Sequence, residues 1–266
     1  MERYIAMILL FIGDIVGSPG RRMICECLPQ IIEEYQVDFT IANGENLAGG
    51  FGINRKIYDE MIDVGIDAFT MGNHVWDNKD IFNFIKNADR IVRPLNIHPD
   101  LPGCGSRIFN IGNSKILVIA VVGRTFMPPA DCPFQAINEV LKEYKDQTDY
   151  IFVDIHAEAT SEKMALGWYL DGRISALVGT HTHVQTNDSR IMPQGCGYLT
   201  DAGMTGPYNS VLGMDKDIVI DRFLYQMPKH FEPAQGDLQF NGVIFDLTFD
   251  GKCREIKLIN FIKPSL

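Results

Sequence analysis

Basic residues are scarce in this 266-residue sequence, in which 24 lysines and arginines stand against 34 aspartates and glutamates and the formal net charge at pH 7 is -10. An acidic surface repels nucleic acid backbones at long range, and no basic strip with interleaved aromatic residues is present. Extended binding to nucleic acid is therefore not expected. A small anionic substrate remains compatible with the charge if buried cations reverse the local potential.

Paired cysteines and long apolar segments are also missing. The six cysteines form no Cys-x-x-Cys pair, which favours free thiols in a reducing compartment over a disulfide framework or a zinc knuckle. The apolar run 7–12 is too short to span a bilayer, and Gly13 and Asp14 end it without the small residues of a signal-peptide cleavage site. We expect a cytoplasmic protein with no membrane-spanning or secretory segment.

Short apolar runs alternate with helical stretches along the chain, a pattern typical of α/β sandwiches. With 46% hydrophobic and 22% charged residues, the chain can bury a sizeable core. Strands are expected at 7–13, 37–42, 67–71, 116–122, 150–155, 174–179, 197–200, 238–249 and 255–262. Helices are expected at 18–35, 54–64, 77–89, 134–145, 158–170 and 216–226. Parallel strands early and hairpin-like strands late predict two sheets packed face to face, with helices outside, in one domain spanning residues 1–266.

Polar side chains directly follow several of the predicted strands. The candidate functional residues in these five clusters are Asp14, Glu45, Asn46, Asn73, His74, His156, His181 and His183. Because parallel strands bring their C-terminal ends to one edge of a sheet, the clusters are expected to converge there. Carboxylate, amide and imidazole groups together suit manganese, iron or zinc, and the absence of cysteine argues against a closed structural zinc site.

Each cluster taken alone has an ordinary structural explanation. Asp14 suits a turn, the Glu45 segment suits a solvated loop, and a single histidine at a strand end, such as His156, is more often structural than catalytic. The pair His181 and His183 is more specific, because alternate residues of an extended segment share one face, as two ligands of a metal must. The expected convergence of all five clusters favours an open, catalytic metal site.

In this order the clusters resemble the signature of the calcineurin-like metallophosphoesterase superfamily, and in detail they resemble its YmdB-type branch of bacterial phosphodiesterases. The similarity covers nearly the whole chain, through segments 13–21, 43–46, 71–77, 154–163, 178–186 and 201–207. The resemblance implies a four-layer α/β/β/α sandwich of two mixed sheets flanked by helices. It also implies a centre for two divalent metal ions, with iron or manganese favoured and zinc or magnesium as alternatives.

The resemblance also implies roles for single residues, motif by motif. It assigns the first metal to Asp14, Asn46 and His183, the second metal to Asn73, His156 and His181, the bridging position to Glu45, and proton donation to His74. Family members hydrolyse phosphodiesters, and cyclic nucleotides, 2′,3′-cyclic ones in particular, are characteristic substrates. We therefore expect a phosphodiesterase that attacks a small-molecule phosphodiester with a hydroxide activated by two metals, while His74 protonates the leaving oxygen.

Two departures from the wider superfamily favour the YmdB-type branch, which shares both. Val16 stands where many members carry a histidine, and Glu45 stands where they carry an aspartate. The loss of an imidazole predicts a weaker, more exchangeable first metal, with Asn46 as the oxygen ligand in its place.

Two other functions would use the same residues: a phosphomonoesterase or nucleotidase, and a slow-turnover regulatory metal-binding protein. No side chain is assigned to substrate binding. Phe51 and Trp76 are candidates for stacking on a base, although packing is the more common role. Arg21, Arg93 and Arg124 are candidates for binding phosphate, although structural pairing is more common. Self-association as a homo-oligomer is compatible with the sequence, which defines no surface for it.

Overall fold

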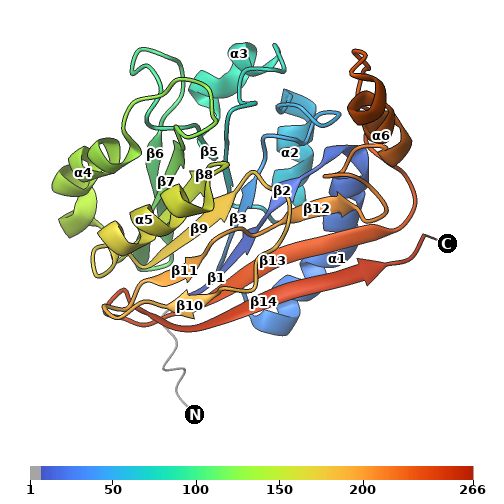
Figure 1. The fold of residues 1–266 in the computed structure, drawn as a ribbon. Helices are drawn as coiled ribbons and strands as arrows, with labels where there is room; N and C mark the ends of the chain where they lie inside the picture. Colours follow the sequence, from blue (N-terminus) through green and yellow to red (C-terminus); the bar gives the residue numbers. More distant parts are fainter. Residues whose placement is uncertain (1–6, 266) are drawn as a thin grey trace.

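Two β-sheets packed face to face, with helices on their outer faces, build the fold (Figure 1). The structure is a computed structural model that describes residues 7–265. Each sheet contains both parallel and antiparallel neighbours, so both sheets are mixed. The four-layer α/β/β/α sandwich predicted from the sequence is confirmed.

The first sheet joins the early strands to the last two strands of the chain. Its spatial order is β2 (Asp14–Ile15), β12 (Met204–Pro207), β13 (Leu238–Leu247), β1 (Met7–Ile12), β3 (Phe39–Asn43), β4 (Ala68–Thr70) and β5 (Ile91–Val92), with β14 (Cys253–Lys263) paired to β13. The second sheet has the order β10 (Arg190–Ile191), β11 (Gly197–Leu199), β9 (Ala176–Thr180), β8 (Tyr150–His156), β7 (Ser114–Val122) and β6 (Ser106–Ile111).

Helices cover the outer face of each sheet. The first sheet is covered by α1 (Gly17–Tyr35), α2 (Arg55–Val64), α3 (Ile81–Phe84) and the short η1 (Ile85–Asn87). The second is covered by α4 (Pro133–Tyr144) and α5 (Thr160–Leu170), with η2 (Lys145–Gln147) after α4. A last helix, α6 (Lys216–Tyr225), projects at one end of the sandwich (Figure 1). None of the helices within residues 7–265 combines the length and hydropathy that a bilayer crossing requires.

The strand β1 shows why the first apolar run has no polar alternation. Leu9 and Phe11 point into the core between the sheets, and the Phe11 ring lies 5.1 Å from that of Phe152 in β8. Leu10 and Ile12 point the other way, into the core under α1 and α2. Because both faces are buried, a strand in this position has apolar residues throughout.

Two parts of the sequence-based prediction differ from the structure. The helix expected at 77–89 is only α3 and η1, because residues 74–80 form turns, in which Asp77 accepts a hydrogen bond from His74 Nδ1 at 2.7 Å. The short strands β2, β5, β6, β10 and β12 were not predicted. All side chains of the edge strand β6 are at least partly exposed, so its sequence lacks the apolar pattern of a buried strand.

Candidate metal centre

The C-terminal ends of strands from both sheets meet at one edge of the sandwich. From the first sheet, β2 and the loops after β3 and β4 bring Asp14, Glu45, Asn46, Asn73 and His74. From the second sheet, the end of β8 brings His156, and the loop after β9 brings His181 and His183. All eight residues singled out from the sequence therefore lie in this region.

The ring of His156, which is fully buried, is the centre of this group. Its Nε2 lies 3.0 Å from Glu45 Oε1, from Asn73 Oδ1 and from His181 Nδ1. A single N–H does not satisfy three such neighbours, so hydrogen bonding alone does not explain the arrangement. When two ligand atoms each lie about 2.1 Å from the same ion, and the angle between them at the ion is about 90°, they lie about 3.0 Å from each other. Each of the three neighbours therefore lies at the distance from His156 Nε2 that separates two ligands of one divalent ion.

A chain of buried hydrogen bonds fixes the orientation of His156. The hydroxyl of Thr180 donates to Asp154 Oδ1 at 2.7 Å, and therefore accepts from His156 Nδ1 at 2.9 Å. Asp154 Oδ2 accepts from the hydroxyl of Thr70 at 2.5 Å, so the carboxylate is held from both sides. With the proton on Nδ1, the Nε2 lone pair of the neutral ring points toward the other three atoms.

His181 is oriented in a similar way by a residue that the sequence did not identify. Its Nε2 lies 3.1 Å from Glu158 Oε2, which leaves Nδ1 to face His156. The only sequence signal for Glu158 is its position two residues after His156, and a carboxylate just after a strand has many ordinary roles. A carboxylate on the outer nitrogen of an imidazole is the usual companion of a metal-binding histidine.

The loop 181–183 is held in a strained conformation. His181 (φ 98°) and His183 (φ 64°) both have positive φ, which non-glycine residues rarely adopt. Between them, Thr182 donates its backbone N–H (3.1 Å) and its hydroxyl (2.7 Å) to Asp201 Oδ2. Lys163 Nζ lies 2.7 Å from the same oxygen, and both charged side chains are buried. This pair therefore fixes the backbone that carries both histidines.

Gly72 allows the two sheets to approach at this point. A Cβ atom on Gly72 would lie 2.3 Å from His156 Cδ2 and 2.4 Å from Glu45 Oε2. Both distances are far below van der Waals contact, so any side chain here would displace the imidazole or the carboxylate. The glycine of the segment 72–74 is thus required by the close packing of the centre.

The atoms predicted for the first metal are less closely gathered. Asp14 Oδ2 accepts the backbone N–H of His181 at 3.2 Å, but Asp14 Oδ1 is buried without a hydrogen-bond partner in the described part of the chain. Asn46 Oδ1 is also buried and has no partner within residues 7–265. The Nε2 of His183 lies 3.8 Å from Asp14 Oδ1, while its Nδ1 lies 3.0 Å from Leu212 O. Buried oxygens are normally satisfied, so these two oxygens fit a bound cation.

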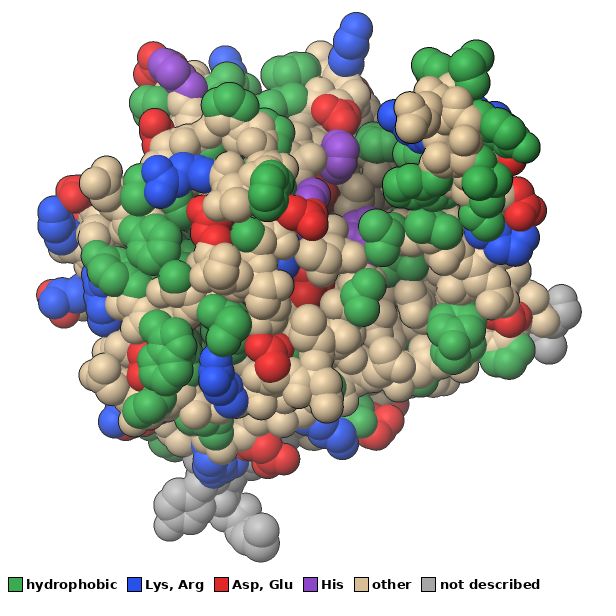
Figure 2. Space-filling model, in the orientation of Figure 1, with side chains coloured by type: hydrophobic (Ala, Val, Ile, Leu, Met, Phe, Trp, Pro, Cys, Tyr) green, Lys and Arg blue, Asp and Glu red, His purple; other side chains and the backbone are tan. Residues whose placement is uncertain are grey.

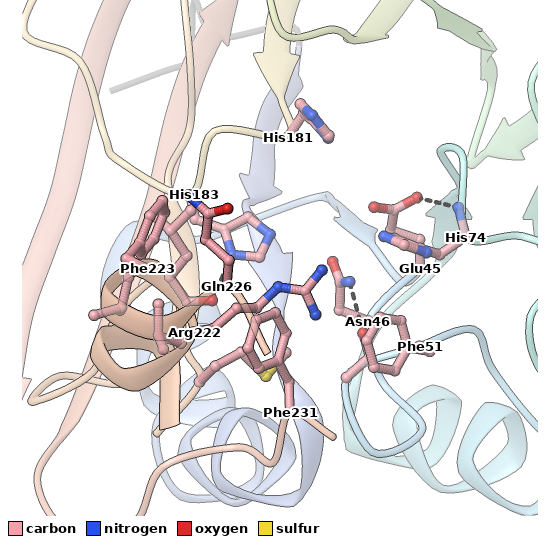
Figure 3. Close-up of a pocket in the computed structure, with 15 residues that line it drawn as sticks. Glu45, Asn46, Phe51, His74, His181, His183, Arg222, Phe223, Gln226 and Phe231 are labelled. Carbon is pink, nitrogen blue, oxygen red and sulfur yellow. Dashed lines mark hydrogen bonds between the residues drawn. The ribbon is translucent and has the colours of Figure 1, made fainter. Parts of the chain in front are cut away.

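His74 lies beside the cluster, on the wall of an adjoining pocket (Figure 3). Its backbone N–H donates to Glu45 Oε2 at 2.9 Å, and its Nδ1 lies 2.7 Å from Asp77 Oδ2. Because the carboxylate accepts the proton on Nδ1, Nε2 is the ring nitrogen left for a ligand. The ring of Phe51 packs edge-on against His74, with centroids 5.1 Å apart.

Burial and neighbouring charges shift the pKa values of the buried groups, some upward and some downward. Burial lowers the pKa of His156, but the charges of Glu45 and Asp14 outweigh it and raise the pKa to about 9. Burial raises the pKa of Glu45, but His156 outweighs it and lowers the pKa to about 2. Burial and the charge of His156 lower the pKa of His181 to about 3. A proton on His156 therefore supplies the positive charge that the acidic groups require when no metal is bound.

Most of the other side chains considered for substrate binding have structural partners. Arg93 is buried and donates to four backbone carbonyl groups between residues 94 and 102. Arg21 donates to a backbone carbonyl at 2.5 Å, and Trp76 stacks on Phe82 with ring centroids 5.3 Å apart. Phe51 instead lines the pocket beside His74, and at Arg124 it is the backbone N–H that donates to the Glu162 carboxylate at 3.0 Å.

The pocket has a volume of about 700 Å³ and opens directly onto the cluster (Figure 3). Five of the predicted residues line it: Glu45, Asn46, His74, His181 and His183. The rest of the lining is mainly apolar and includes α6. A concave, mainly apolar space of this size with a few polar groups is typical of a small-molecule site.

The four-layer sandwich with this cluster at its strand ends defines a metallophosphoesterase-like protein. A family model described as YmdB-like protein matches residues 10–259. The chain belongs to the YmdB-like family, and it is a phosphoesterase hydrolase, as the motifs predicted.

Individual relatives agree with this assignment. The 2′,3′-cyclic-nucleotide 2′-phosphodiesterase of Bacillus subtilis (strain 168) is 52% identical over 241 residues, which cover 91% of each chain. The crystal structure of a hypothetical protein from Thermus thermophilus has a TM-score of 0.92 at 43% identity, and the match covers 97% of this chain and 100% of the other. That of a novel phosphatase from Mycoplasma pneumoniae has a TM-score of 0.92 at 34% identity, over 97% and 94% of the two chains.

Proposed function

We propose that the chain is a metal-dependent phosphodiesterase that hydrolyses 2′,3′-cyclic nucleotides. The observation that supports this proposal most strongly is the set of three atoms, each 3.0 Å from His156 Nε2, at the strand ends of a phosphoesterase fold. The name of the Bacillus subtilis relative, 52% identical, supports the choice of a cyclic nucleotide as substrate.

Two divalent ions are proposed for this centre, with iron or manganese as the favoured metals. Asp14, Asn46 and His183 would hold the first ion, Asn73, His156 and His181 the second, and Glu45 would contact both. Imidazole groups combined with carboxylate and amide oxygens suit borderline ions of this kind. The buried oxygens without partners support the first ion, and the 3.0 Å contacts of His156 support the second. Bound ions would supply Lewis acidity, which lowers the pKa of water toward about 7 and neutralises phosphate charge.

The proton for the leaving group is assigned to His74. In the reaction, the oxygen of water forms a bond to phosphorus, the bond from phosphorus to one ribose oxygen breaks, and the proton that the water loses passes to solvent, from which His74 is protonated again. The departing oxygen takes a proton from Nε2 of the His74 imidazolium, because Asp77 holds the other ring nitrogen at 2.7 Å. The hydrogen bond from the His74 backbone to Glu45, 2.9 Å long, keeps the proton donor beside the centre. The product is a nucleoside monophosphate.

The first test compares a diester with the corresponding monoester. The chain would be stripped of metal, reloaded separately with Mn²⁺, Fe²⁺, Zn²⁺ or Mg²⁺, and given 2′,3′-cyclic AMP or 3′-AMP. We expect the metal-free chain to be inactive and the manganese or iron forms to open the cyclic diester and stop at the monophosphate. Faster release of phosphate from 3′-AMP would identify a phosphomonoesterase, and stoichiometric metal without turnover would identify a regulatory protein.

Metal binding is expected to depend on pH through His156. Its pKa in the metal-free protein is raised from 6.5 to about 9, so the proton must leave before Nε2 binds an ion. The affinity for Mn²⁺ should therefore rise with pH below about 9, by up to about tenfold per pH unit. Calorimetric titration at pH 6.5, 7.5 and 8.5, in buffers of different ionisation enthalpy, measures the affinity and the released proton. A pH-independent affinity without proton release would contradict this assignment of the proton.

The same proton affects the folding of the metal-free chain. A raised pKa means that the protonated form of His156 stabilises the folded state fully below pH 6.5, and that this stabilisation is lost as the pH rises toward about 9. The Tm of the metal-free chain should consequently fall over that interval. Saturation with Mn²⁺ should remove the fall, which provides the control.

A further inference from the structure

The side of the pocket facing the metal centre is built from α6 and the segment that follows it (Figure 3). Arg222 and Phe223 reach the pocket from the helix, Gln226 from its C-cap, and Phe231 from the chain beyond. Glu45, Asn46 and His74 lie on the other side. A molecule whose phosphate lies at the metal centre therefore extends toward α6.

The helix α6 is held firmly at its start but packs little along its length. The side chain of Asp215 caps it by accepting the backbone N–H groups of Asp217 (3.0 Å) and Ile218 (3.1 Å). The structure describes α6 in full, and only Val219 among its residues is buried. Its remaining apolar side chains are thus left for solvent or for a ligand.

Phe223 is the clearest example of an apolar side chain without a packing role. It is 81% exposed although it lines the pocket mouth, whereas Tyr225, 67% exposed, does not line the pocket. Figure 2 shows apolar side chains gathered over α6, next to the hollow in which the histidines appear. A large exposed aromatic ring at the edge of a ligand pocket is typical of a binding surface.

Among the described residues that line the pocket, Arg222 is the only lysine or arginine. Its guanidinium lies over the ring of Phe231, 5.1 Å from the centroid, and no carboxylate pairs with it in the described part of the chain. A planar cation stacked on a ring still presents its N–H groups at the edge. These groups are available for an anionic or hydrogen-bonding ligand in an otherwise acidic protein.

We propose that α6 and Phe231 form the nucleoside-binding wall of the active-site pocket. Phe223 would contact the base or ribose at the mouth, and Arg222, oriented by Phe231, would donate N–H groups to the nucleotide. Aromatic rings and guanidinium planes are the groups on which proteins stack unpaired bases. The proposal rests on the proposed function, because it takes the cyclic nucleotide as the occupant.

The position of these side chains favours a nucleotide over a protein partner. The pocket of about 700 Å³ is concave and continuous with the metal centre, and it lies within the size range of small-molecule sites. Arg222 faces this enclosed space instead of pairing with a surface carboxylate. A protein partner would instead use the outward-facing side chains of α6, Leu224 and Tyr225, which are both 67% exposed.

The test compares two cyclic diesters that differ only in the nucleoside. With the Mn²⁺-loaded full chain, kcat and KM would be measured for 2′,3′-cyclic AMP and for ethylene phosphate, a five-membered cyclic diester without ribose or base. The variants are Phe223→Ala and Arg222→Gln, and the matched control is Tyr225→Ala on the same helix. All three positions are exposed, where substitutions leave folding nearly unchanged.

The quantity compared is kcat/KM for 2′,3′-cyclic AMP divided by kcat/KM for ethylene phosphate. We expect Phe223→Ala to lower this ratio by about 10-fold. Loss of a stacked aromatic ring costs roughly 5- to 150-fold in affinity, and the expected loss lies within that range. The loss should appear as a higher KM for 2′,3′-cyclic AMP. Arg222→Gln should lower the ratio as well, whereas Tyr225→Ala should keep the wild-type ratio. An unchanged ratio in both variants, or an equal loss in Tyr225→Ala, would overturn the nucleoside wall while leaving the phosphodiesterase in place. A wild-type chain that hydrolyses neither diester would overturn the proposed function itself.

Discussion

Glu45→Gln is expected to lower activity with manganese by more than 100-fold and to reduce the metal bound per chain. The Glu45 carboxylate is 1% exposed, and its Oε1 lies 3.0 Å from His156 Nε2. Glutamine keeps the shape but removes the negative charge that offsets a cation in this buried position. Loss of a partner that only orients a ligand costs about 10- to 100-fold in metal affinity or activity, and loss of a ligand should cost more.

The measurement for Glu45→Gln is elemental analysis of the purified chain together with kcat at saturating Mn²⁺. Two further variants provide reference values for the loss of metal and of turnover. Glu158→Gln removes the carboxylate behind His181 and should fall within the 10- to 100-fold range. Glu34→Gln changes an exposed carboxylate on α1 and should behave as wild type. Wild-type metal content and turnover in Glu45→Gln would contradict the placement of an ion at this carboxylate.

His74→Asn should lower kcat by about 10²- to 10⁴-fold on a diester with an alkoxide leaving group, while bound metal stays at the wild-type level. The side chain is held by Asp77 and lines the pocket, and it is not among the three neighbours of His156 Nε2 at 3.0 Å. Removing it therefore takes away the proton donor but no proposed metal ligand. An aryl diester, whose leaving group needs no proton, should lose much less activity.

The comparison of the two leaving groups distinguishes two roles for His74: donation of a proton to the leaving oxygen, or hydrogen bonding that only supports the site. His98→Asn is the matched control, because His98 is exposed and outside the pocket. An equal loss of kcat on the alkyl and aryl diesters, or a loss of bound metal, would assign His74 a supporting role in the geometry of the centre.

Much of the fold was predictable because its central strands are buried on both faces. β1 is a continuous apolar run, β8 is apolar apart from Asp154 and its last residue, His156, and polar residues follow at the end of each strand. The edge strands β6 and β10 were missed because exposed side chains carry no periodic signal. The face-to-face packing of the two sheets followed from the family resemblance as well as from the pattern.

The candidate ligands were found by their order along the chain, whereas most of the residues that orient them were not. Asp77 and Glu158 are near their histidines in sequence but have the composition of ordinary turns. Lys163 and Asp201 are 38 residues apart, and the partner of a buried charge is chosen by tertiary packing that no local pattern encodes. The pocket wall on α6 was missed for a similar reason, since a helix sequence rich in apolar residues does not reveal which of them face a ligand.

The proposed ligands come from both sheets, and this has a consequence for the mechanics of the molecule. Glu45 and Asn73 follow strands of the first sheet, while His156 and His181 belong to the second. An ion shared by these four side chains would crosslink the two halves of the sandwich at one edge, much as a disulfide joins distant segments. Loading with metal would then strengthen the contact between the two sheets at this edge, and resistance to proteolysis would report on occupancy even where no substrate is turned over.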